Sequence, residues 1–523
     1  MEKDREELAR SPDVMPPRDK IKSLEELAAI SAQLRHEGKT VVHCHGVYDL
    51  LHLGHVRHLE MARNEGDVLI VTVTADDFVN KGPGRPVFPD LLRAEMLGAM
   101  NYVDWVGINH DISAISVLEA LQPDVYVKGS DYANPDDDIT GNIQRERDTV
   151  ESLGGRVVFT RGMTFSSSTL INQYTDVLDP ELRRFLNEYR EENSIHSLLD
   201  LIEKVKNYKV LIVGDAIVDE YQYIAPLGKS SKDNIIASLY QEKELFAGGA
   251  IAAANHVAGI CGQVDLLTVL GDDDKYVDFI KESLKPNVRL VPIERSGVPT
   301  TRKCRFVESG KIRKLFEVYY MDDTPYDRDI TATLNDYIST HAADYDLVMV
   351  TDFGHGLIED STIKALCANA RFLAVNAQSN SANMGYNLIT KYPRADFICI
   401  DAPEARLAAG QKIMDLGEVA SEILPSRIEC DRIILTDGAK GCVAYQRGLP
   451  LKRVPAFTQT VVDSVGAGDA FLSISSPLVA AGGDLNQVAF IGNATGAIEV
   501  GIVGNRSSVE KESLMKYITT LLK

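Results

Sequence analysis

The stretch Thr40-Val-Val-His-Cys-His-Gly-Val-Tyr-Asp-Leu-Leu-His-Leu-Gly-His55 decides the fold of the first part of the chain. It starts as a short β-branched strand, passes through a glycine turn, and leads into apolar residues with helical spacing. His52 and His55 stand three residues apart at the start of that helix, so they share one face. Gly54 lets a ligand approach the backbone, and a helix N-terminus offers unpaired N–H groups to an anion. The stretch therefore predicts a strand–turn–helix unit that binds a triphosphate and stabilises charge developing on it.

This histidine-rich stretch has two competing interpretations. A metal site would be expected to show a partner glutamate in an HExxH frame or clustered cysteines, and the stretch has neither. The other interpretation is that the histidines are polar loop residues without chemistry. His43, His45 and His58 fit that structural interpretation individually, whereas the spacing of His52 and His55 favours a functional one.

Short β-branched runs alternate with helical segments along the whole chain, which predicts an α/β fold with parallel strands. A charged, strongly helical segment at 176–200 separates two such series, and we expect it to be a helical linker. The predicted domains are therefore 1–175 and 201–523. The expected strands lie at 41–42, 68–73, 105–108, 125–127 and 157–159 in the first domain, and at 210–213, 265–269, 347–350, 372–375, 397–400 and 433–435 in the second.

The composition excludes several classes of protein. The 523 residues are 45% hydrophobic and 25% charged, which excludes disordered and fibrous chains. The net charge of −21 argues against a nucleic-acid or anionic-membrane partner, because phosphate surfaces would repel it. The seven cysteines are scattered without a CxxC pair, as in a reducing compartment. The N-terminal residues lack the apolar segment of a secretory signal and no run reaches the ~18 apolar residues of a membrane span, so we expect a cytoplasmic protein.

A second motif, Val462-Asp-Ser-Val-Gly-Ala-Gly-Asp-Ala-Phe471, lies near the end of the chain. The small residues at 466–468 open a helix whose N–H groups can hold a transferring γ-phosphate. Asp469, at that helix end, can accept a proton from an attacking hydroxyl. The glycine- and aspartate-containing segments 214–219 and 247–250 strengthen this interpretation, since a lone glycine-rich turn would be weak.

The first motif resembles the signature of the cytidylyltransferase-like nucleotidyltransferases. Within them the resemblance is greatest to the adenylyltransferase half of the bifunctional heptose kinase/adenylyltransferases, with the domain order reversed. It implies that a sugar phosphate attacks the α-phosphorus of a nucleoside triphosphate and releases pyrophosphate, usually with Mg²⁺. Positioning and charge neutralisation would provide most of the catalysis. The further segments that carry the resemblance are 81–87, Arg93, 102–105, 127–132 and 166–168.

The resemblance implies roles for individual residues of the first domain. The residues expected to contact the triphosphate or neutralise phosphate charge are His52, His55, Lys81, Arg93 and Lys128. The remaining residues expected in the nucleotide site are Gly46, Tyr48, Asp49, Gly54, Ser166, Ser167 and Ser168. His45 departs from the pattern, because relatives usually carry Asn or Asp before the glycine, and this departure concerns recognition of the substrate or base.

The second motif and its upstream segments resemble the ribokinase family of sugar kinases, over about residues 205–523. The resemblance implies a ribokinase-like α/β sandwich with a small β lid, following the Rossmann-like nucleotidyltransferase domain. In that family Gly466, Ala467 and Gly468 would form the anion hole and Asp469 would be the general base. The other implied residues are Asp215, Asp219, Gly248, Gly249 and Lys303 for the sugar, Thr436 and Gly438 for ATP, and Asp401 and Glu404 for Mg²⁺ and phosphate.

Several positions depart from the sugar-kinase pattern. Ala252 stands about where relatives carry a sugar-binding Asn, and Asn376-Ala-Gln378 stands where heptose kinases have Asp-Pro-Lys. Segment 230–236 lacks their Pro-rich substrate stretch, and Asp401 replaces an Asn. Two interpretations follow: the kinase phosphorylates a different sugar or polyol, or this domain is a non-catalytic scaffold.

These observations lead to one expected function and two alternatives. We expect a bifunctional enzyme that makes an activated sugar, with ATP as phosphoryl donor, ATP or CTP as nucleotidyl donor, and Mg²⁺ as cofactor. The alternatives are a nucleotidyltransferase with an inactive kinase-like domain, and a cytidylyltransferase for a polyol or alcohol phosphate. The expected partners are a sugar phosphate and a nucleoside triphosphate, and segments 220–245 and 300–320 resemble a lid through which the chain pairs as a homodimer or higher homo-oligomer.

Overall fold

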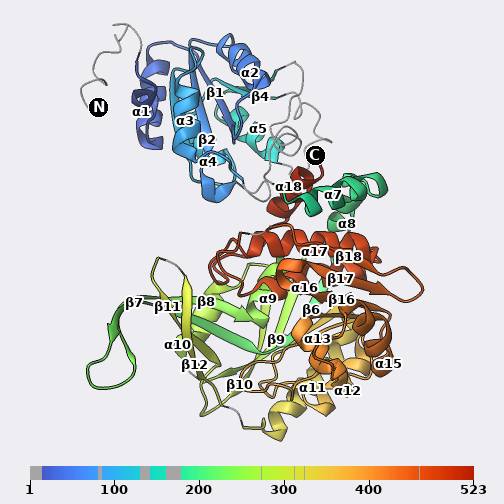
Figure 1. Cartoon of the computed structure of the whole chain (residues 1–523). Helices are drawn as coiled ribbons and strands as arrows, with labels where there is room; N and C mark the ends of the chain where they lie inside the picture. The colour runs from blue at the N-terminus through green and yellow to red at the C-terminus, as the bar shows by residue number, and fades with distance from the viewer. Residues whose placement is uncertain are drawn as a thin grey trace. The chain divides into compact units, whose positions relative to one another are not determined.

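The computed structural model describes residues 15–79, 85–129, 142–160, 178–272, 274–310, 312–322, 324–458 and 460–523 (Figure 1). The chain divides into two compact units. One comprises residues 1–178 with 515–521 and 523, and the other comprises 179–514 with 522. Among the described residues, no helix combines the length and the apolar character that crossing a membrane requires.

The first unit is built on a five-stranded parallel sheet in the order β3-β2-β1-β4-β5. Its strands are runs of β-branched residues buried on both faces, as a parallel sheet covered by helices requires. The strands are β1 Val41–Gly46, β2 Val68–Thr74, β3 Trp105–Asn109, β4 Val125–Lys128 and β5 Arg156–Phe159. The helices are α1 Leu24–His36, α2 Leu53–Arg63, α3 Asp90–Gly98, α4 Ile115–Leu121 and α5 Asn142–Ser152.

The strand order of this sheet reverses between β1 and β4. From β1 the chain adds β2 and β3 on one side, and it then returns to place β4 and β5 on the other. The crossovers on the two sides therefore diverge at the carboxyl ends of β1 and β4, where open α/β sheets bind their ligands. Gly46 and Lys128 are the last residues of these two strands.

The second unit contains a nine-stranded sheet in the order β10-β9-β6-β13-β14-β15-β16-β17-β18. Neighbouring strands are parallel as far as β16, and β17 and β18 are antiparallel additions. The strands are β6 Lys209–Gly214, β9 Gln263–Gly271, β10 Val288–Arg295, β13 Leu347–Asp352, β14 Leu373–Ala377, β15 Phe397–Asp401, β16 Arg432–Thr436, β17 Cys442–Gln446 and β18 Lys452–Val454. The parallel strands thus direct residues such as Gly214, Asp352 and Asp401 toward one edge of the sheet.

Segment 176–200, predicted as a linker, includes two helices of the second unit. α7 begins at Pro180 with Asp179 as its N-cap, and its Tyr189 ring stacks on Phe490 with 4.3 Å between centroids. The helices with residues in this unit are α7 Pro180–Glu192, α8 Ile195–Lys204, α9 Ala250–Ala258, α10 Asp274–Ser283, α11 Arg328–His341, α12 Asp360–Asn369, α13 Ala402–Ala409, α14 Leu416–Glu418, α15 Leu424–Arg427, α16 Ala467–Ala480, α17 Leu485–Glu499 and α18 Lys511–Leu521.

A separate four-stranded sheet, which we call the lid, has the order β12-β11-β7-β8. Its strands are β7 Ala216–Lys229, β8 Ile236–Gly249, β11 Arg302–Glu308 and β12 Arg313–Tyr320. Figure 1 shows the β7–β8 hairpin extending away from the rest of the lid. The model has the predicted fold class, because it contains two parallel α/β units and a small β lid on the second.

Candidate active sites

In the first unit, His52 and His55 meet at the N-terminus of α2, as the motif predicts. His52 is the N-cap of α2, and its Nδ1 accepts a hydrogen bond from the backbone N–H of Gly54 at 3.1 Å. The two imidazole rings stack with 3.9 Å between centroids, and Tyr48 packs edge-on against His55. Burial lowers the pKa of His52, so its ring is neutral at pH 7. A neutral imidazole at a helix N-terminus can donate a hydrogen bond to phosphate without carrying charge.

Asp49, predicted to line the nucleotide site, is buried and bonded to the protein. Its Oδ1 accepts hydrogen bonds from the backbone N–H groups of Val87 and Phe88 at 2.6 and 3.3 Å, and its Oδ2 lies 4.0 Å from Arg85 Nη1. Asp49 therefore fixes the segment before α3 against the turn after β1. Gly46 packs closely next to it, because an added Cβ would lie 3.2 Å from the Tyr48 ring, a tight contact.

Arg93, predicted to neutralise phosphate charge, lies in the interior of the first unit. The side chain is fully buried, its Nε donates to the Phe88 carbonyl at 2.8 Å, and its Nη1 donates to the Val47 carbonyl at 2.6 Å. Its Nη2 pairs with Asp76 at 2.5 Å. The guanidinium thus holds two loops and a carboxylate in place, and the structure gives it a positioning role in the protein interior.

Lys128 ends β4 and lies beside β1 at the edge where the strand order reverses. Its Nζ pairs with Glu146 at 2.8 Å, and burial together with the Lys128 charge lowers the pKa of His45 to about 3. The His45 ring bonds to the hydroxyls of Thr72 and Thr74 on β2, at 2.9 and 3.3 Å. His45 is therefore neutral at pH 7 and is held by β2, and Lys128 places a positive charge at this edge of the sheet. The predicted Lys81 and Ser166, Ser167 and Ser168 lie outside the described residues.

In the second unit, the predicted phosphate-binding turn opens α16. Gly466 is the N-cap with φ +89°, and an added Cβ there would lie 2.2 Å from Asn505 Oδ1, so the turn requires glycine. Ala467 begins the helix, and a Cβ added at Gly468 would meet open space. Backbone N–H groups at this end of α16 are available to an anion, because a helix leaves its first N–H groups without intrahelical partners.

Asp463 fixes this turn, although sequence reasoning gave it no role. Its Oδ1 accepts from the backbone of Val465 at 3.0 Å, and its Oδ2 accepts from the Tyr221 hydroxyl at 2.7 Å and from the backbone of Gly504 at 3.0 Å. Lys314 also forms an ion pair with it. Tyr221 and Lys314 belong to the lid, so the lid and the phosphate-binding turn share one buried carboxylate.

Asp469 has the properties of a general base. Burial and the Asp219 charge raise its pKa to about 7, whereas a hydrogen bond from Gln378 and the charge of Lys303 act in the opposite direction. The Gln378 Nε2 donates to Asp469 Oδ1 at 2.6 Å. A base with a pKa near 7 is well matched to accept a proton at physiological pH.

The residues predicted to bind sugar gather around this base. Asp215 is buried, accepts from the Phe353 backbone at 3.0 Å, and has its pKa raised to about 7 by burial and by Asp352. Gly248 permits the close approach of Asp219, since an added Cβ would lie 2.2 Å from Asp219 Oδ2. The other predicted sugar residues are Gly249, which adopts φ +56°, and Lys303, whose Nζ lies 5.7 Å from the Phe353 ring centroid.

Asp401 and Glu404 form a capping box at the start of α13. Each carboxylate accepts from the backbone N–H of the other residue, at 3.2 and 3.1 Å, and Glu404 also accepts from Ser379. Burial, followed by the Asp401 charge, raises the pKa of Glu404. Such a close pair of carboxylates gains from a divalent cation, and Mg²⁺ is commonly held by one or two carboxylates plus phosphates and water. Asp401 pairs across the sheet with Thr436, one of the predicted ATP residues, and Gly438 follows two residues later.

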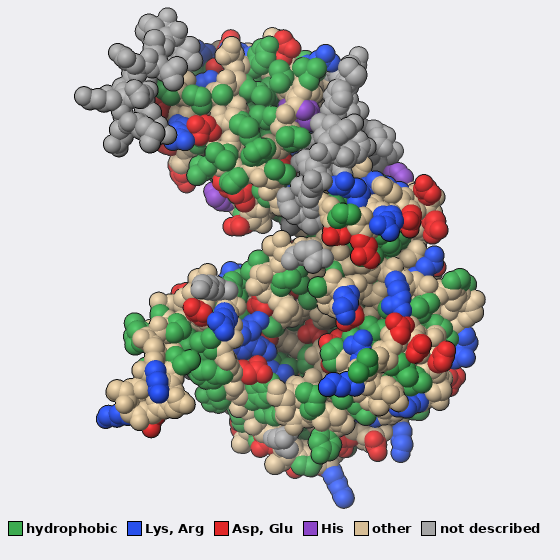
Figure 2. All heavy atoms as spheres, viewed as in Figure 1, with side chains coloured by type: hydrophobic (Ala, Val, Ile, Leu, Met, Phe, Trp, Pro, Cys, Tyr) green, Lys and Arg blue, Asp and Glu red, His purple; other side chains and the backbone are tan. Residues whose placement is uncertain are grey.

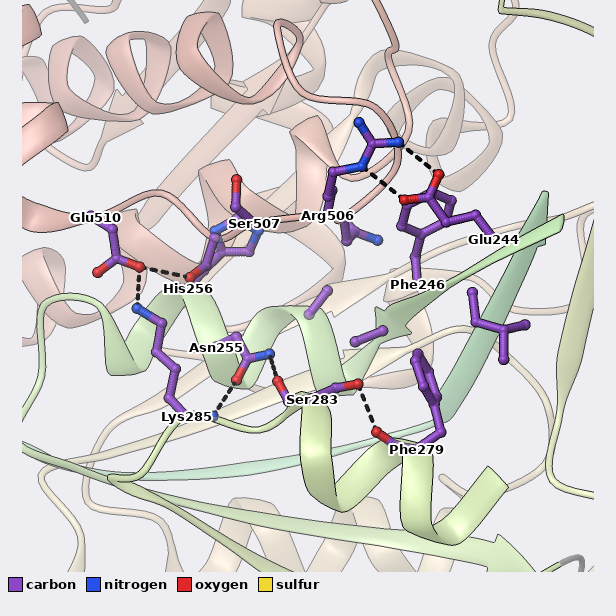
Figure 3. A pocket seen from close by; sticks show the side chains of 15 residues that line it. Glu244, Phe246, Asn255, His256, Phe279, Ser283, Lys285, Arg506, Ser507 and Glu510 are labelled. Atoms are coloured by element: carbon purple, nitrogen blue, oxygen red, sulfur yellow. Dashed lines mark hydrogen bonds and ion pairs between the residues drawn. The ribbon is translucent and has the colours of Figure 1, made fainter. Parts of the chain in front are cut away.

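A pocket of about 330 Å³ lies in the second unit between β8, α9, α10 and the segment 505–510 (Figure 3). Ala252, at the position where relatives carry a sugar-binding Asn, lines it. Arg506 donates to both oxygens of Glu244 at 2.8 and 2.6 Å, and Lys285 pairs with Glu510. The charged side chains of this pocket thus compensate one another. Figure 2 shows a separate feature, a hollow on the viewed face of this unit with acidic side chains inside and basic ones at its rim.

Comparison with known families agrees with both motifs. Residues 207–512 match the pfkB family carbohydrate kinase model, and residues 43–173 match the cytidylyltransferase-like model. The first match spans more than half of the chain, so the chain belongs to the pfkB family of carbohydrate kinases. The predicted combination of domains is confirmed, with the nucleotidyltransferase-like region ahead of the kinase, the reverse of the order in the HldE proteins.

Similar proteins cover the chain in parts. The bifunctional protein HldE of Citrifermentans bemidjiense is 41% identical over 140 residues, 26% of this chain and 27% of its own length. That of Geobacter sulfurreducens is 35% identical over 175 residues, 33% of this chain and 32% of its own length, so these alignments span about a third or less of the relatives. The structure of phosphofructokinase-2 from Escherichia coli in complex with potassium is 13% identical and covers 60% of this chain and 100% of that chain at a TM-score of 0.50, a likeness of fold alone.

Proposed function

We propose that the protein is a bifunctional enzyme of activated-sugar synthesis. The second unit transfers the γ-phosphoryl group of ATP to a hydroxyl of a sugar or polyol, and the first unit joins a sugar phosphate to a nucleotide. The observation that carries the kinase part is Asp469, held at the start of α16 with a pKa of about 7 beside the carboxylates of the predicted sugar site. The stacked pair His52 and His55 at the start of α2 carries the transferase part.

In the kinase reaction, Asp469 takes the proton of the acceptor hydroxyl. The hydroxyl oxygen then forms a bond to the γ-phosphorus, the bond from that phosphorus to the β–γ bridging oxygen breaks, and ADP leaves. The N–H groups of the turn 466–468 stabilise the charge on the transferring group. Asp215 and Asp219 orient the acceptor by accepting hydrogen bonds from its other hydroxyls.

In the transferase reaction, a phosphate oxygen of the sugar phosphate attacks the α-phosphorus of a nucleoside triphosphate, and pyrophosphate leaves. His52 and His55 donate hydrogen bonds to the triphosphate, and Lys128 neutralises charge at the neighbouring strand end. We assign the same triphosphate site to Lys81 and Ser166–Ser168. The donor is ATP or CTP and the acceptor is a heptose-like sugar phosphate, as the resemblance to the HldE proteins suggests.

The cofactor of both reactions is Mg²⁺, and in the second unit Asp401 and Glu404 are its proposed ligands. Their closely placed carboxylates and the raised pKa of Glu404 support this assignment. When bound, the ion would neutralise charge on the phosphates of the nucleotide. Thr436 and Gly438, next to Asp401, would then contact the ATP.

We assign the two activities to domains at 1–175 and 201–523, and the functional form to a homodimer that pairs through the lid. Apolar side chains on the hairpin support this pairing, with Ile236 67% exposed and Leu239 57% exposed. An exposed apolar patch is a common sign of an interaction surface.

Two assays test the proposed activities. ATP consumption by the wild-type chain over a panel of sugars should be lost in Asp469→Asn, and no sugar-dependent turnover in the wild type would contradict the kinase assignment. Pyrophosphate release with ATP, CTP, GTP or UTP plus sugar 1-phosphates should be lost in His55→Ala but retained in Asp469→Asn. Full transferase activity in His55→Ala would contradict the site assignment.

A further inference from the structure

Gln378 is fixed in front of Asp469 by its own main chain. It directly follows β14, its backbone N–H donates to the Asp352 carbonyl at 2.8 Å, and its carbonyl accepts from Asn387 Nδ2 at 3.0 Å. Its side-chain Nε2 donates to Asp469 Oδ1 at 2.6 Å. The side-chain amide that binds the Asp469 carboxylate therefore extends from a backbone position held by two hydrogen bonds.

A buried network supports that position. Asn387 is 5% exposed, and its Nδ2 also donates to the carbonyl and to Oδ1 of Asp352, both at 3.0 Å. Lys391 Nζ donates to Asn387 Oδ1 at 2.7 Å and pairs with Asp352 Oδ2 at 2.6 Å, and the Tyr392 hydroxyl donates to the same carboxylate at 2.7 Å. Charge-assisted hydrogen bonds of this kind are short and strong, so the network rigidifies the loop that carries Gln378.

The groups facing Asp469 come from four different elements. Asp219 on β7 is acidic and disfavours its ionised form, and the charge of Asp469 in turn raises the pKa of the buried Glu499 on α17. Lys303 on β11 is a cation but is itself buried, and desolvation lowers its pKa. Gln378 is the neutral donor of this set. Its amide favours the carboxylate by hydrogen bonding without adding a positive charge that would weaken the base.

We propose that Gln378 is a positioning residue for the general base: its amide holds Asp469 through Oδ1, so that Oδ2 takes the proton of the acceptor hydroxyl. The proposal rests on the assignment of Asp469 as the base of the proposed kinase reaction. In this role Gln378 acts on the reaction through Asp469. A positioned carboxylate avoids the loss of rate that follows from a misoriented base.

The first test follows sugar-dependent ATP consumption against pH. Gln378→Leu removes the donor, so the pKa of Asp469 should rise, and the pH below which the rate of ATP consumption falls should move up by about one unit. At pH 6 the rate should then be about tenfold lower than in the wild type. Gln378→Lys should move that pH down by at least about one unit. Gln411→Leu, at an exposed glutamine remote from this network, should leave the profile unchanged. Equal loss of rate at every pH in Gln378→Leu would overturn the proposal.

The second test needs no substrate and uses the melting temperature of the full chain. The Asp469 pKa is about 7 when folded and about 3.9 in an unfolded chain, so stability falls as the pH rises through that window. Asp469→Asn should therefore raise Tm more at pH 8 than at pH 5. In the Gln378→Leu background this rise should be larger and extend to higher pH. An identical rise in both backgrounds would overturn the positioning role, whereas a larger rise without turnover of any sugar would support it and contradict only the proposed kinase function.

Discussion

Single glycines and arginines determine much of the geometry of both sites. Gly248 lets Asp219 approach the backbone, and Arg93 holds together the loops that carry Val47 and Phe88. At Gly248 a larger side chain would have no room, and at Arg93 a side chain without a guanidinium would leave the two carbonyls without their donor. Their removal should therefore have different consequences: substitution of the glycine affects the acceptor site, and substitution of the arginine affects the stability of the first unit.

Gly248→Ala should abolish sugar phosphorylation while the chain remains folded. The added Cβ would lie 2.2 Å from Asp219 Oδ2, so the carboxylate must leave its position in the acceptor site. We expect kcat/KM for the sugar to fall at least about 100-fold, because a misplacement of about 1 Å can cost that much. Gly496→Ala is the matched control, since nothing lies within 4 Å of its added Cβ in α17. The assay is ATP consumption with circular dichroism as a check on folding, and normal kcat/KM in Gly248→Ala would contradict the placement of Asp219.

Arg93→Ala should destabilise the first unit. The change leaves the carbonyls of Val47 and Phe88 and the carboxylate of Asp76 without their donor in or near the interior. Breaking a buried, charged hydrogen-bond set costs about 3 kcal/mol of unfolding free energy. Urea unfolding measures this cost, and Arg57→Ala, at an exposed arginine of α2, should be close to neutral. An Arg93→Ala variant of normal stability but weak nucleotide binding would contradict this stabilising role and support the role in charge neutralisation that the sequence predicts.

The sequence was sufficient for the residues that act within one local motif. The spacing of His52 and His55 predicts their shared helix face, and the run 466–469 predicts a glycine turn followed by a base. It was not sufficient for the contacts of Arg93. The motif shows that a cation stands at this position, but it does not show which backbone carbonyls bind the guanidinium in the fold. Gln378 and Asp463 were missed as site residues. Gln378 meets Asp469 across 91 residues of chain, and Asp463 meets its lid partners Lys314 and Tyr221 across 149 and 242 residues, so only the fold brings them together.

The lid and the phosphate-binding turn are linked at the level of whole elements. β12 contributes Lys314 and β7 contributes Tyr221 to the same carboxylate, Asp463, which also fixes the backbone of the turn before α16. β8 is joined to the segment 505–510 through Glu244 and Arg506. A change in the lid should therefore be felt at the site of phosphoryl transfer, although the lid strands carry none of the phosphate-binding N–H groups.

Lys314→Met should impair the kinase and spare the transferase. The Asp463 side chain is 0% exposed, and its ion pair with Lys314 contributes to keeping its pKa low, so loss of the cation leaves a buried carboxylate less compensated. We expect the turn to shift and kcat/KM for ATP to fall about tenfold. Lys412→Met, at an exposed lysine of the same unit, is the control. A loss of pyrophosphate release in Lys314→Met, or no change in ATP consumption, would contradict this link.

At the scale of the whole molecule, the net charge of −21 has to be reconciled with ligands that are themselves anionic. In the proposed sites, helix N-termini and a few placed cations would bind these ligands, so a basic surface is not needed. Such a charge also opposes association between copies through long-range repulsion, so any contact between two chains should be short-range and apolar. Some exposed side chains of the β7–β8 hairpin, Ile236 and Leu239 among them, are of this kind.

The hairpin should hold two copies of the chain together. Ile236 and Leu239 are apolar and more than half exposed, and replacing both with lysine would place charges in a buried contact at a cost of several kcal/mol. Sedimentation of the wild type should give a dimer or larger species, and Ile236→Lys combined with Leu239→Lys should give the 57.5 kDa monomer. Ile413→Lys, at an apolar residue 91% exposed outside the lid, should leave the association unchanged. A monomeric wild type, or an oligomer that survives both hairpin substitutions, would show that the chain does not pair through its lid.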